Sequence, residues 1–330
     1  MVYYKSSLLY GLYTLNEKGT ITMIHEVMIF GHKNPDTDSI LSSIVMANLE
    51  NALGNSAKPV RLGNVNKETQ YVLNYVNYDA PEQIKDVADG QRVILVDHNE
   101  ATQSVSNIAN AKIEKVVDHH SINVNVPYQV YYHCEPVGCT GTVLYKLYKQ
   151  HDVEISREMA IFMLSAIISD TLLFKSPTCT QEDKTIAEKL AVIAGITDVE
   201  TYGKDMLKAG TDISEFTPAE VINIDSKLFE NNGKKFKIAQ INTADIEDVF
   251  KKQSYFEAAI HDEIQNENLD FYVFAATDII NSNSKIISLG QDATVVEKAY
   301  GIPLDNNTAM LEGVVSRKKQ LLPKILDNLL

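Results

Sequence analysis

The chain has 330 residues, of which 45% are apolar and 22% charged, and its net charge is −14. A chain of this length is expected to form about two domains, each with a hydrophobic core. The acidic net charge argues against nonspecific nucleic-acid binding. The sequence has no apolar run near ~18 residues, which argues against a membrane span. Its three cysteines include no CxxC pair, which argues against a disulfide framework or a structural zinc site.

Residues 1–22 stand apart from the rest of the chain. An apolar stretch at residues 8–15 follows Lys5, but it ends in polar residues instead of the small-residue cleavage site of a signal peptide. We expect residues 1–22 to be a poorly ordered extension, or the product of a misassigned upstream start.

From residue 23 onward, short apolar runs alternate with amphipathic ones. Strands are predicted where the apolar runs are short and continuous, at residues 27–32, 58–63, 92–98 and 112–120. Helices are predicted where apolar residues recur at helical spacing, at residues 39–53, 68–77, 138–150, 157–174 and 181–195. This alternation favours an α/β fold over residues 23–208, with a largely parallel sheet and helices on both faces.

A stretch of small polar residues, Gly and Pro follows, and we predict a linker at residues 209–217. Residues 218–330 are expected to form a smaller α+β domain with a mixed sheet. This domain should contain a hairpin around Asn232-Gly233, a long helix over residues 245–267, and two strands at residues 270–280 and 285–290.

Three of the predicted strands end in residue types that bind metal ions. Because ligands bind at the carboxyl edge of parallel sheets, we expect these side chains to converge. In chain order they are His32, Asp36 and Asp38 at or just beyond the end of the strand at 27–32, Asp97 and His98 at the end of the strand at 92–98, and Asp118, His119 and His120 at the end of the strand at 112–120.

Each of these residues also has a purely structural explanation. Asp38 precedes a helix and equally suits a helix cap, and Asn34-Pro35-Asp36 suits a simple turn. Asp118 suits the orientation of a neighbouring imidazole, and His98 is the weakest ligand candidate. The metal hypothesis therefore rests on the joint pattern.

Asp170 adds a further carboxylate, because it lies in an almost wholly apolar predicted helix. A buried, unpaired carboxylate costs several kcal/mol unless it is compensated, and its neighbours Ser169 and Thr171 offer only hydroxyls. A bound cation would compensate it; the alternative is a polar helix face that opens to the cleft between the domains. The candidate ligands are then His32, Asp36, Asp38, Asp97, His119 and Asp170.

Four carboxylates and two imidazoles are too many ligands for one zinc ion. They suit two divalent ions that share bridging carboxylates, and mixed oxygen and nitrogen ligands without thiolate favour manganese, cobalt or iron. Two such ions can activate a water molecule for displacement at phosphorus.

Arg317, Lys318 and Lys319 form a basic triplet near the C-terminus. Such a triplet is most often a solvated face, but Lys and Arg also neutralise charge at phosphoryl-transfer sites. Since the predicted metal ligands are in the first domain and the triplet is in the second, we expect an active site in the interdomain cleft.

The motifs that carry these residues are specific enough to indicate a family. GHKNPDTDSI, LVDHNE, VVDHH, EPVGCT, LSAIISDTLLFKSPTCT and GVVSRKKQ occur in this order between Met28 and the C-terminus. Together they resemble the family II, or manganese-dependent, inorganic pyrophosphatases of the DHH phosphoesterase superfamily. The resemblance implies a metal-binding DHH domain at residues 23–208 and a substrate-binding domain of the DHHA2 type at residues 218–330.

The resemblance also implies hydrolysis of diphosphate to two phosphates, with a metal-bridging water as the nucleophile. It implies two Mn²⁺ ions per subunit, with Co²⁺ as a substitute and Mg²⁺ as a further ion with the substrate. By similarity, one manganese is held by His32, Asp36, Asp97 and Asp170, and the other by Asp38, Asp97, His119 and Asp170. The residues implied to bind diphosphate are His120, Lys227, Arg317 and Lys318.

A cytoplasmic homodimer without nucleic-acid or membrane partners is implied as well, and three reduced thiols suit the cytoplasm. The alternative function is a DHH-type phosphodiesterase that acts on short oligonucleotides or cyclic dinucleotides and shares the metal ligands. Such an enzyme should carry a GGGH-type element and an aromatic platform for bases, and the sequence contains no GGGH. A non-enzymatic, metal-dependent binding module is the third hypothesis.

Overall fold

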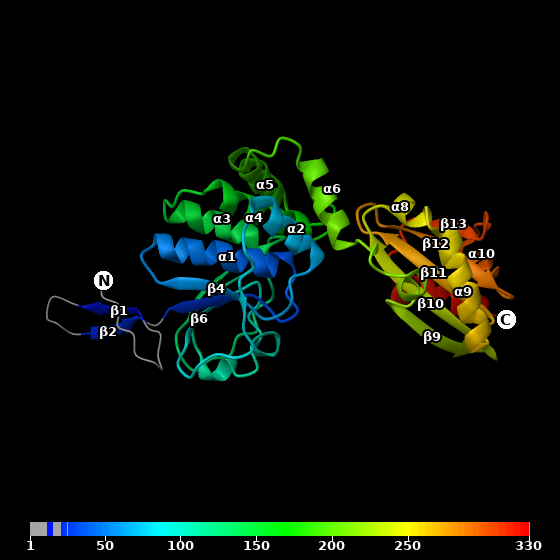
Figure 1. Cartoon of the computed structure of the whole chain (residues 1–330), viewed down its shortest axis with the longest axis horizontal. Coiled ribbons are helices and arrows are strands. Elements are labelled where there is room, and N and C mark those ends of the chain that lie inside the picture. Colours follow the sequence, from blue (N-terminus) through cyan, green and yellow to red (C-terminus); the bar gives the residue numbers. More distant parts are fainter. Residues whose placement is uncertain (1–11, 16–20, 25, 330) are drawn as a thin grey trace. The chain divides into compact units, whose positions relative to one another are not determined.

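The computed structural model describes residues 12–15, 21–24 and 26–329, and the chain divides into two compact units, Met1–Met206 and Leu207–Leu330 (Figure 1). This division falls close to the end of the first predicted domain. The helix α6 (Val199–Gly210) crosses it, and the linker at residues 209–217 stays a prediction.

Two short strands precede the sheet of the first unit. β1 (Leu12–Leu15) pairs antiparallel with β2 (Ile21–Ile24). Residues 1–11 and 16–20 of the predicted extension lie outside the described residues, so its poor order stays a prediction.

The first unit is built on a six-stranded sheet in which all neighbouring strands are parallel, in the order β5-β4-β3-β6-β7-β8. Its central strands β3 and β6 are the runs VMIF and RVILV, whose continuous apolar character suits strands that are covered on both faces. This arrangement confirms the predicted parallel sheet. The strands are β3 (Val27–Phe30), β4 (Ala57–Arg61), β5 (Glu82–Gln83), β6 (Arg92–Val96), β7 (Lys112–Asp118) and β8 (Tyr131–Cys134).

The α-helices of this unit stack in layers against the sheet (Figure 1). α1 and α3 pack on the strands, and α4 packs on both of these helices, which leaves α4 buried along most of its length. Alternate strand residues such as Phe30 and Leu95 pack instead with Val105 and Ile108, in a segment with two short 3-10 turns. The helices are α1 (Thr37–Ala52), α2 (Lys67–Val76), α3 (Thr140–Gln150), α4 (Arg157–Asp170) and α5 (Gln181–Ala194).

The helix predicted over residues 157–174 ends earlier, at Asp170. Residues 172–174 all have positive φ, between 46° and 67°, in a left-handed run that non-glycine residues rarely adopt. The Thr171 carbonyl accepts a hydrogen bond from the backbone N–H of Lys175 at 2.9 Å and closes this turn. The sequence hides the turn because the Leu-Leu-Phe run continues the apolar pattern of the helix.

The second unit contains a five-stranded mixed sheet in the order β13-β12-β11-β10-β9, as predicted. β10 and β11 are parallel and the other neighbours are antiparallel, and the predicted hairpin at Asn232-Gly233 joins β9 to β10. The strands are β9 (Ser226–Asn231), β10 (Lys234–Thr243), β11 (Phe271–Asp278), β12 (Asn283–Gly290) and β13 (Thr308–Leu311).

Helices cover both faces of this second sheet, and β11 shows why. Its residues alternate between two cores, so Tyr272 and Phe274 pack on one face while Phe271 and Val273 pack on the other. The long helix predicted over residues 245–267 consists of two shorter ones, α8 and α9. The helices are α7 (Pro218–Val221), α8 (Ile246–Phe250), α9 (Gln253–Glu267), α10 (Val295–Tyr300) and α11 (Leu322–Asn328). None of the helices in the described ranges has the length and apolar character that a membrane span requires.

Candidate metal centre

The loop between β3 and α1 carries the first predicted ligands. His32 Nδ1 lies 2.8 Å from the Lys33 carbonyl oxygen, so this nitrogen carries a proton and donates it. The Nε2 atom of the same ring lies 3.4 Å from Asp36 Oδ2 and 3.3 Å from Asp97 Oδ2. The loop therefore turns one imidazole nitrogen toward two carboxylates.

Asp36, and not Asp38, caps α1, because its side chain accepts a hydrogen bond from Ser39 N at 3.0 Å. Asp38 lies in the first turn of the helix and is completely buried. Its two oxygens accept from Ser42 Oγ at 2.6 Å and from Thr140 N at 2.8 Å. The capping explanation for Asp38 is therefore wrong, and the two groups that donate these hydrogen bonds to its buried carboxylate are neutral.

Asp97 follows the end of β6 and lies at the middle of the group. It is 2% exposed and has a φ of 57°, an uncommon backbone conformation that often marks functional positions. Its Oδ1 atom lies 3.3 Å from His119 Nε2, while Oδ2 faces His32. Among the residues that the structure describes, Asp97 Oδ2 and His119 Nε2 have no hydrogen-bond partner although both atoms are buried.

The end of β7 supplies two imidazoles with different environments. His119 Nδ1 donates to the Val137 carbonyl at 3.1 Å, and its Nε2 faces Asp97 and, at 3.5 Å, Asp170 Oδ2. His120 Nδ1 donates to the fully buried Asp118 at 2.9 Å, and half of its side chain is exposed. Asp118 thus orients the neighbouring imidazole, which was one of its two predicted roles.

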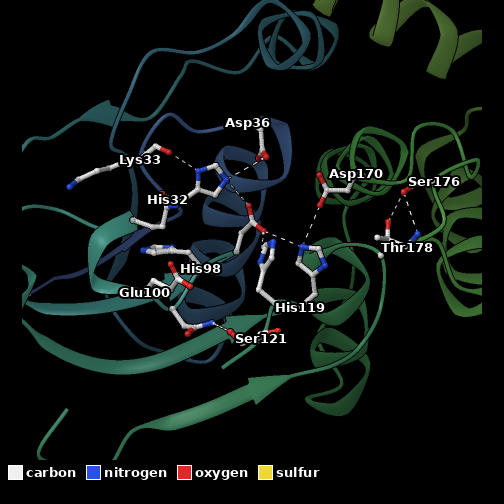
Figure 2. Close-up of a pocket in the computed structure, with 15 residues that line it drawn as sticks. His32, Lys33, Asp36, His98, Glu100, His119, Ser121, Asp170, Ser176 and Thr178 are labelled. Carbon is white, nitrogen blue, oxygen red and sulfur yellow. Dashed lines mark hydrogen bonds and ion pairs between the residues drawn. The ribbon is translucent and has the colours of Figure 1, made fainter. Parts of the chain in front are cut away.

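Asp170 is the last residue of α4 and reaches the same group of side chains (Figure 2). The hydroxyls beside it are engaged elsewhere, since Ser169 donates to Glu68 and Thr171 donates to the Ile167 carbonyl. Neither hydroxyl compensates the charge of Asp170, as expected from the sequence.

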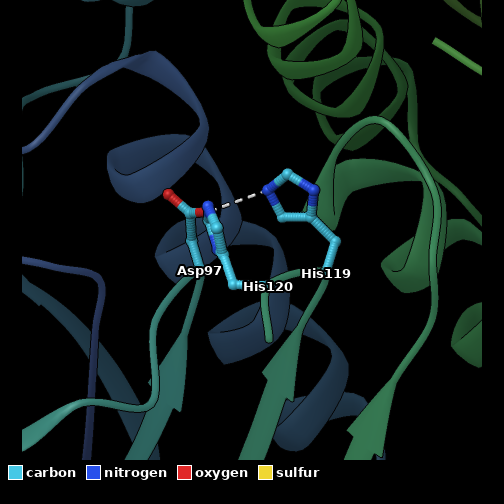
Figure 3. A group of neighbouring side chains, drawn as sticks. All are labelled: Asp97, His119 and His120. Carbon is cyan, nitrogen blue, oxygen red and sulfur yellow. Dashed lines mark ion pairs between the residues drawn. The ribbon is translucent and has the colours of Figure 1, made fainter. Parts of the chain in front are cut away.

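Apart from the fully buried Asp38, the candidate ligands line one cavity of about 730 Å³ within the first unit (Figure 2). Their donor atoms form three overlapping groups, in each of which all atoms lie within 4.8 Å of one another. Asp97 belongs to all three, and Figure 3 shows it with His119 and His120. The groups are His32, Asp36 and Asp97; Asp38, Asp97, His119 and Asp170; and Asp97, His119 and His120.

Crowding of carboxylates shifts the pKa values of the two imidazoles that face them. Burial opposes protonation of His32, but the close carboxylates of Asp36 and Asp97 outweigh it and raise the pKa to about 11. Burial also opposes protonation of His119, yet Asp97 and Asp38 raise its pKa to about 9. Both imidazoles therefore behave as cations in this environment.

The pKa values of the carboxylates shift in opposite directions. Burial and the charge of Asp97 raise the pKa of Asp38 to about 6. Burial and the charges of Asp38 and Asp97 raise the pKa of Asp170 well above its usual range. Burial opposes ionisation of Asp97, but His119 and His32 hold its pKa below the usual range. Positive charge is what the centre lacks.

The donor set fits divalent cations. His32 and His119 each use Nδ1 to bond a backbone carbonyl, so a neutral ring would point the Nε2 lone pair at carboxylate oxygens. That repulsion is relieved only by a proton or a metal ion between the atoms, and a backbone bond at the far nitrogen is the usual arrangement of a metal-binding histidine. Oxygen and imidazole donors without thiolate suit manganese and similar ions.

His98 lies in the same cavity but in none of the three groups. Its Nδ1 donates to the Val96 carbonyl at 2.9 Å, and burial lowers its pKa, so the ring is neutral. This position agrees with the sequence analysis, in which His98 was the weakest ligand candidate.

The other predicted substrate-binding residues belong to the second unit. Lys227 lies on β9, and Lys318 lies in a π-helical turn at Arg317–Leu321. Arg317 Nη2 pairs with Asp225 Oδ1 at 2.9 Å, which brings the turn beside the start of the strand that carries Lys227. π-helical turns are rare and occur frequently at functional sites.

Sequence reasoning missed the residues that hold these groups in place. Gln240 accepts from the Arg317 backbone N–H at 2.8 Å and donates to the Val315 carbonyl at 2.9 Å. Glu68 accepts from Thr37 Oγ1 at 2.6 Å, next to the ligands of the first loop. No sequence signal could have found them, because a single polar residue in a strand or helix pattern looks like a surface residue.

Comparison with known proteins gives the centre a context. Residues 26–167 match the N-terminal domain of the DHH family, and residues 204–328 match the DHHA2 domain. The chain is 50% identical over 306 residues to the manganese-dependent inorganic pyrophosphatase of Bacillus subtilis strain 168, covering 92% of this chain and 99% of that protein. A Bacillus velezensis protein named as a probable manganese-dependent inorganic pyrophosphatase is 51% identical with the same coverage.

A solved structure is similar as well. The crystal structure of a candidate family II inorganic pyrophosphatase from Methanococcus jannaschii matches with a TM-score of 0.59 and 39% sequence identity. The match covers 91% of this chain and 98% of that chain. The likeness therefore extends over both units and over the motifs that carry the candidate ligands.

Proposed function

The chain belongs to the manganese-dependent, family II inorganic pyrophosphatases, and we propose that it hydrolyses diphosphate to two phosphates at the centre around Asp97. The observation that carries this proposal is the pair of ligand groups that meet at one buried carboxylate. Such a pair suits two divalent ions that act together on one phosphoryl group.

We assign the ligands as follows. Asp97 would contribute to the binding of both ions, His32 and Asp36 would complete the first group, and Asp38 and His119 would belong to the second. Asp170 also belongs to the second group, where its Oδ2 atom lies 3.5 Å from His119 Nε2. Its additional place beside the first ion, which the family resemblance implies, remains part of the proposal.

When bound, the two ions supply Lewis acidity, which lowers the pKa of a water molecule and neutralises charge on phosphoryl oxygens. The chain contributes the donor atoms that would position the ions. Asp38 and Asp97 are held rigidly by Ser42 and Thr140, so little entropy is lost when they bind the ions.

His120 is suited to hold the substrate. Asp118 fixes its Nδ1 and, through that hydrogen bond, raises the pKa of the ring, so that an imidazolium is favoured. The exposed Nε2 edge of the ring can then donate a hydrogen bond to a phosphate oxygen in the same cavity.

Lys227, Arg317 and Lys318 of the second unit are proposed to neutralise the remaining charge of the diphosphate. Arg317 presents a planar fork for phosphate oxygens, and its pairing with Asp225 fixes one side of that fork. The compact charge of diphosphate favours this role over the recognition of nucleotide bases, for which stacking side chains are needed.

We also propose the more detailed features that the family resemblance implies. They are two manganese ions per subunit, Co²⁺ as a functional substitute, Mg²⁺ as a further ion with the substrate, a homodimer, and a cytoplasmic location. Donor atoms that suit manganese equally suit cobalt, which supports the substitution.

The test is phosphate release by protein stripped of metal and reloaded with manganese, cobalt, magnesium or zinc. A cyclic dinucleotide and a short oligonucleotide serve as competing substrates. Fast hydrolysis of diphosphate with manganese or cobalt, and little cleavage of nucleotides, is the expected result. Cleavage of nucleotides while diphosphate is ignored would favour the DHH-type phosphodiesterase and overturn the proposed role of the basic turn.

A further inference from the structure

Asp183 is completely buried, yet it forms no ion pair with any residue in the part of the chain that the structure describes. It occupies the third position of α5, where its Oδ2 atom accepts from Thr180 N and Thr180 Oγ1 at 2.7 Å each. This is a capping box, which normally sits at the protein surface. Burial of the charge therefore needs more than the helix cap.

Two further donors come from a distant part of the chain. Gly138 N donates to Asp183 Oδ2 at 2.9 Å, and Thr142 Oγ1 donates to Oδ1 at 2.6 Å. A Cβ atom at Gly138 would lie 2.8 Å from Asp183 Oδ2, so no side chain could be placed there without moving the carboxylate. The fit joins the start of α5 to the segment 137–142 at the start of α3.

That segment touches three of the candidate metal ligands. Thr140 N donates to Asp38 Oδ2 at 2.8 Å, and Thr140 Oγ1 donates to Asp97 Oδ1 at 3.3 Å. The Val137 carbonyl accepts from His119 Nδ1 at 3.1 Å and so fixes which ring nitrogen faces the carboxylates. Asp183 forms hydrogen bonds to Gly138 and Thr142 of this segment. Thr140 lies between these two residues, and Val137 directly precedes Gly138.

Asp183 also restrains the other rim of the cavity. Thr180 ends the segment that leaves Asp170 through the left-handed turn at residues 172–174 and then passes Thr178, which lines the cavity (Figure 2). A turn of this kind persists only where the surrounding structure holds it in place. The two bonds between Asp183 and Thr180 provide such an anchor at its far end.

We propose that Asp183 is a positioning residue for the second group of metal ligands, acting through the segment 137–142 and through Thr180. The proposal rests on the metal centre assigned above. Residues that orient metal ligands without touching the ion change metal affinity by about 10- to 100-fold when they are lost. A plain helix cap would change the stability of the fold and leave the affinity of the folded protein as it was.

Four variants separate the two roles. Asp183→Ala removes every acceptor, while Thr142→Val removes only the bond between α3 and Asp183 and leaves the capping box intact. Asp183→Asn is the conservative variant, because its oxygen can take the three donors at Oδ2 while its NH₂ group donates to the Thr142 hydroxyl. Glu220→Ala is the matched control, since Glu220 closes a capping box on Thr217 at 2.8 Å but is exposed and lies in the second unit.

The experiment is a manganese titration of the full chain stripped of metal, with free Mn²⁺ followed by its electron paramagnetic resonance signal. Circular dichroism and the thermal midpoint report folding in parallel. We expect Asp183→Ala to weaken manganese binding by about 10- to 100-fold and Thr142→Val by about 3-fold or more. Asp183→Asn should stay within about 3-fold of the wild type, and Glu220→Ala should match it.

A folded Asp183→Ala protein with wild-type manganese affinity would overturn the positioning role, whatever its thermal midpoint. If Asp183→Ala does not fold, the manganese titration of Thr142→Val tests the proposal instead. Wild-type manganese affinity in that variant would overturn the positioning role. A wild-type chain that binds no manganese would instead overturn the assigned metal centre, so failure at that level is distinguishable from failure of the positioning role.

Discussion

The two imidazoles of the proposed metal centre carry protons that a bound metal ion would displace. With pKa values of about 11 and about 9, His32 and His119 are both protonated at neutral pH before metal binds. A histidine nitrogen must lose its proton to bind a metal ion, so binding is linked to proton release. We therefore predict that manganese binds more tightly as the pH rises.

The size of the effect follows from the number of protons. One proton released per imidazole corresponds to about a tenfold fall in the apparent dissociation constant per pH unit, for each ion. For both ions together the affinity should rise about a hundredfold between pH 7 and pH 8. Asp170, whose pKa is raised by burial and by Asp38 and Asp97, adds to the protons released by the second group.

Isothermal titration calorimetry in buffers of different ionisation enthalpy counts these protons directly. At pH 7 the stripped protein should release at least about two protons as it fills with manganese, and His119→Gln should reduce the count by about one. His261→Gln, an exposed position in α9, is the control and should leave the count unchanged. An affinity that does not vary with pH, together with no proton release, would refute the assignment of these two imidazoles as ligands.

Three further variants and one pH series test the centre and the basic turn. Asp97→Asn should weaken the binding of both ions and lower kcat by at least about a hundredfold, because both ligand groups contain this carboxylate. Wild-type affinity for either ion in a manganese titration would contradict the shared role of Asp97. Arg317→Ala or Lys318→Ala should lower kcat/KM for diphosphate by about 10²- to 10³-fold with unchanged manganese affinity, and loss of manganese in either variant would reject their assignment to the substrate. In the stripped protein, protonation of His119 contributes about 3 kcal/mol to the free energy of unfolding. This contribution is complete below the unfolded pKa of 6.5 and is lost as the pH rises through the folded pKa of about 9. The thermal midpoint measured without metal should therefore fall between pH 7 and pH 9.5, and a midpoint that rises over this range would contradict the raised pKa.

Sequence patterns predicted the parts of the fold that depend on continuous apolar runs. β6 and β7 were predicted because buried parallel strands need such runs, and the mixed sheet followed from the hairpin at Asn232-Gly233. β5 has only two residues, both exposed, and β8 is a partly exposed edge strand, so neither gives a periodic signal. Short edge strands are defined by their neighbours and not by their own sequence.

The convergence of the candidate ligands could be predicted for the same reason, because strand ends in a parallel sheet meet at one edge. His32, Asp97 and His119 converge as expected. The early end of α4 at Asp170 could not be predicted, since the turn that follows is made of three apolar residues with positive φ. Asp183 likewise gives only the sequence signature of a helix cap, and its second set of donors depends on contacts more than 40 residues away in the chain.

The charges of the candidate metal ligands can be compared with those of the residues proposed to bind diphosphate. Asp36, Asp38, Asp97 and Asp170 bring four negative charges when ionised, which two divalent ions would neutralise. Diphosphate carries about four negative charges when fully ionised, and the residues proposed to bind it offer an equal number of positive ones. These are protonated His120, Lys227, Arg317 and Lys318.

The balance makes substrate binding depend on the metal ions. Without the ions, the carboxylates that face the cavity would repel a polyanion. An anion that loses its hydration shell in the cavity needs positive charge beside it, and the carboxylates carry negative charge. We predict that the stripped protein does not bind imidodiphosphate, a slowly hydrolysed analogue of diphosphate, and that manganese restores binding. Calorimetric titration with and without manganese measures this, with Lys318→Ala as the variant that should bind metal normally but the analogue weakly. Equal binding of the analogue to the stripped and loaded proteins would mean that the cations of the second unit act independently of the metal centre.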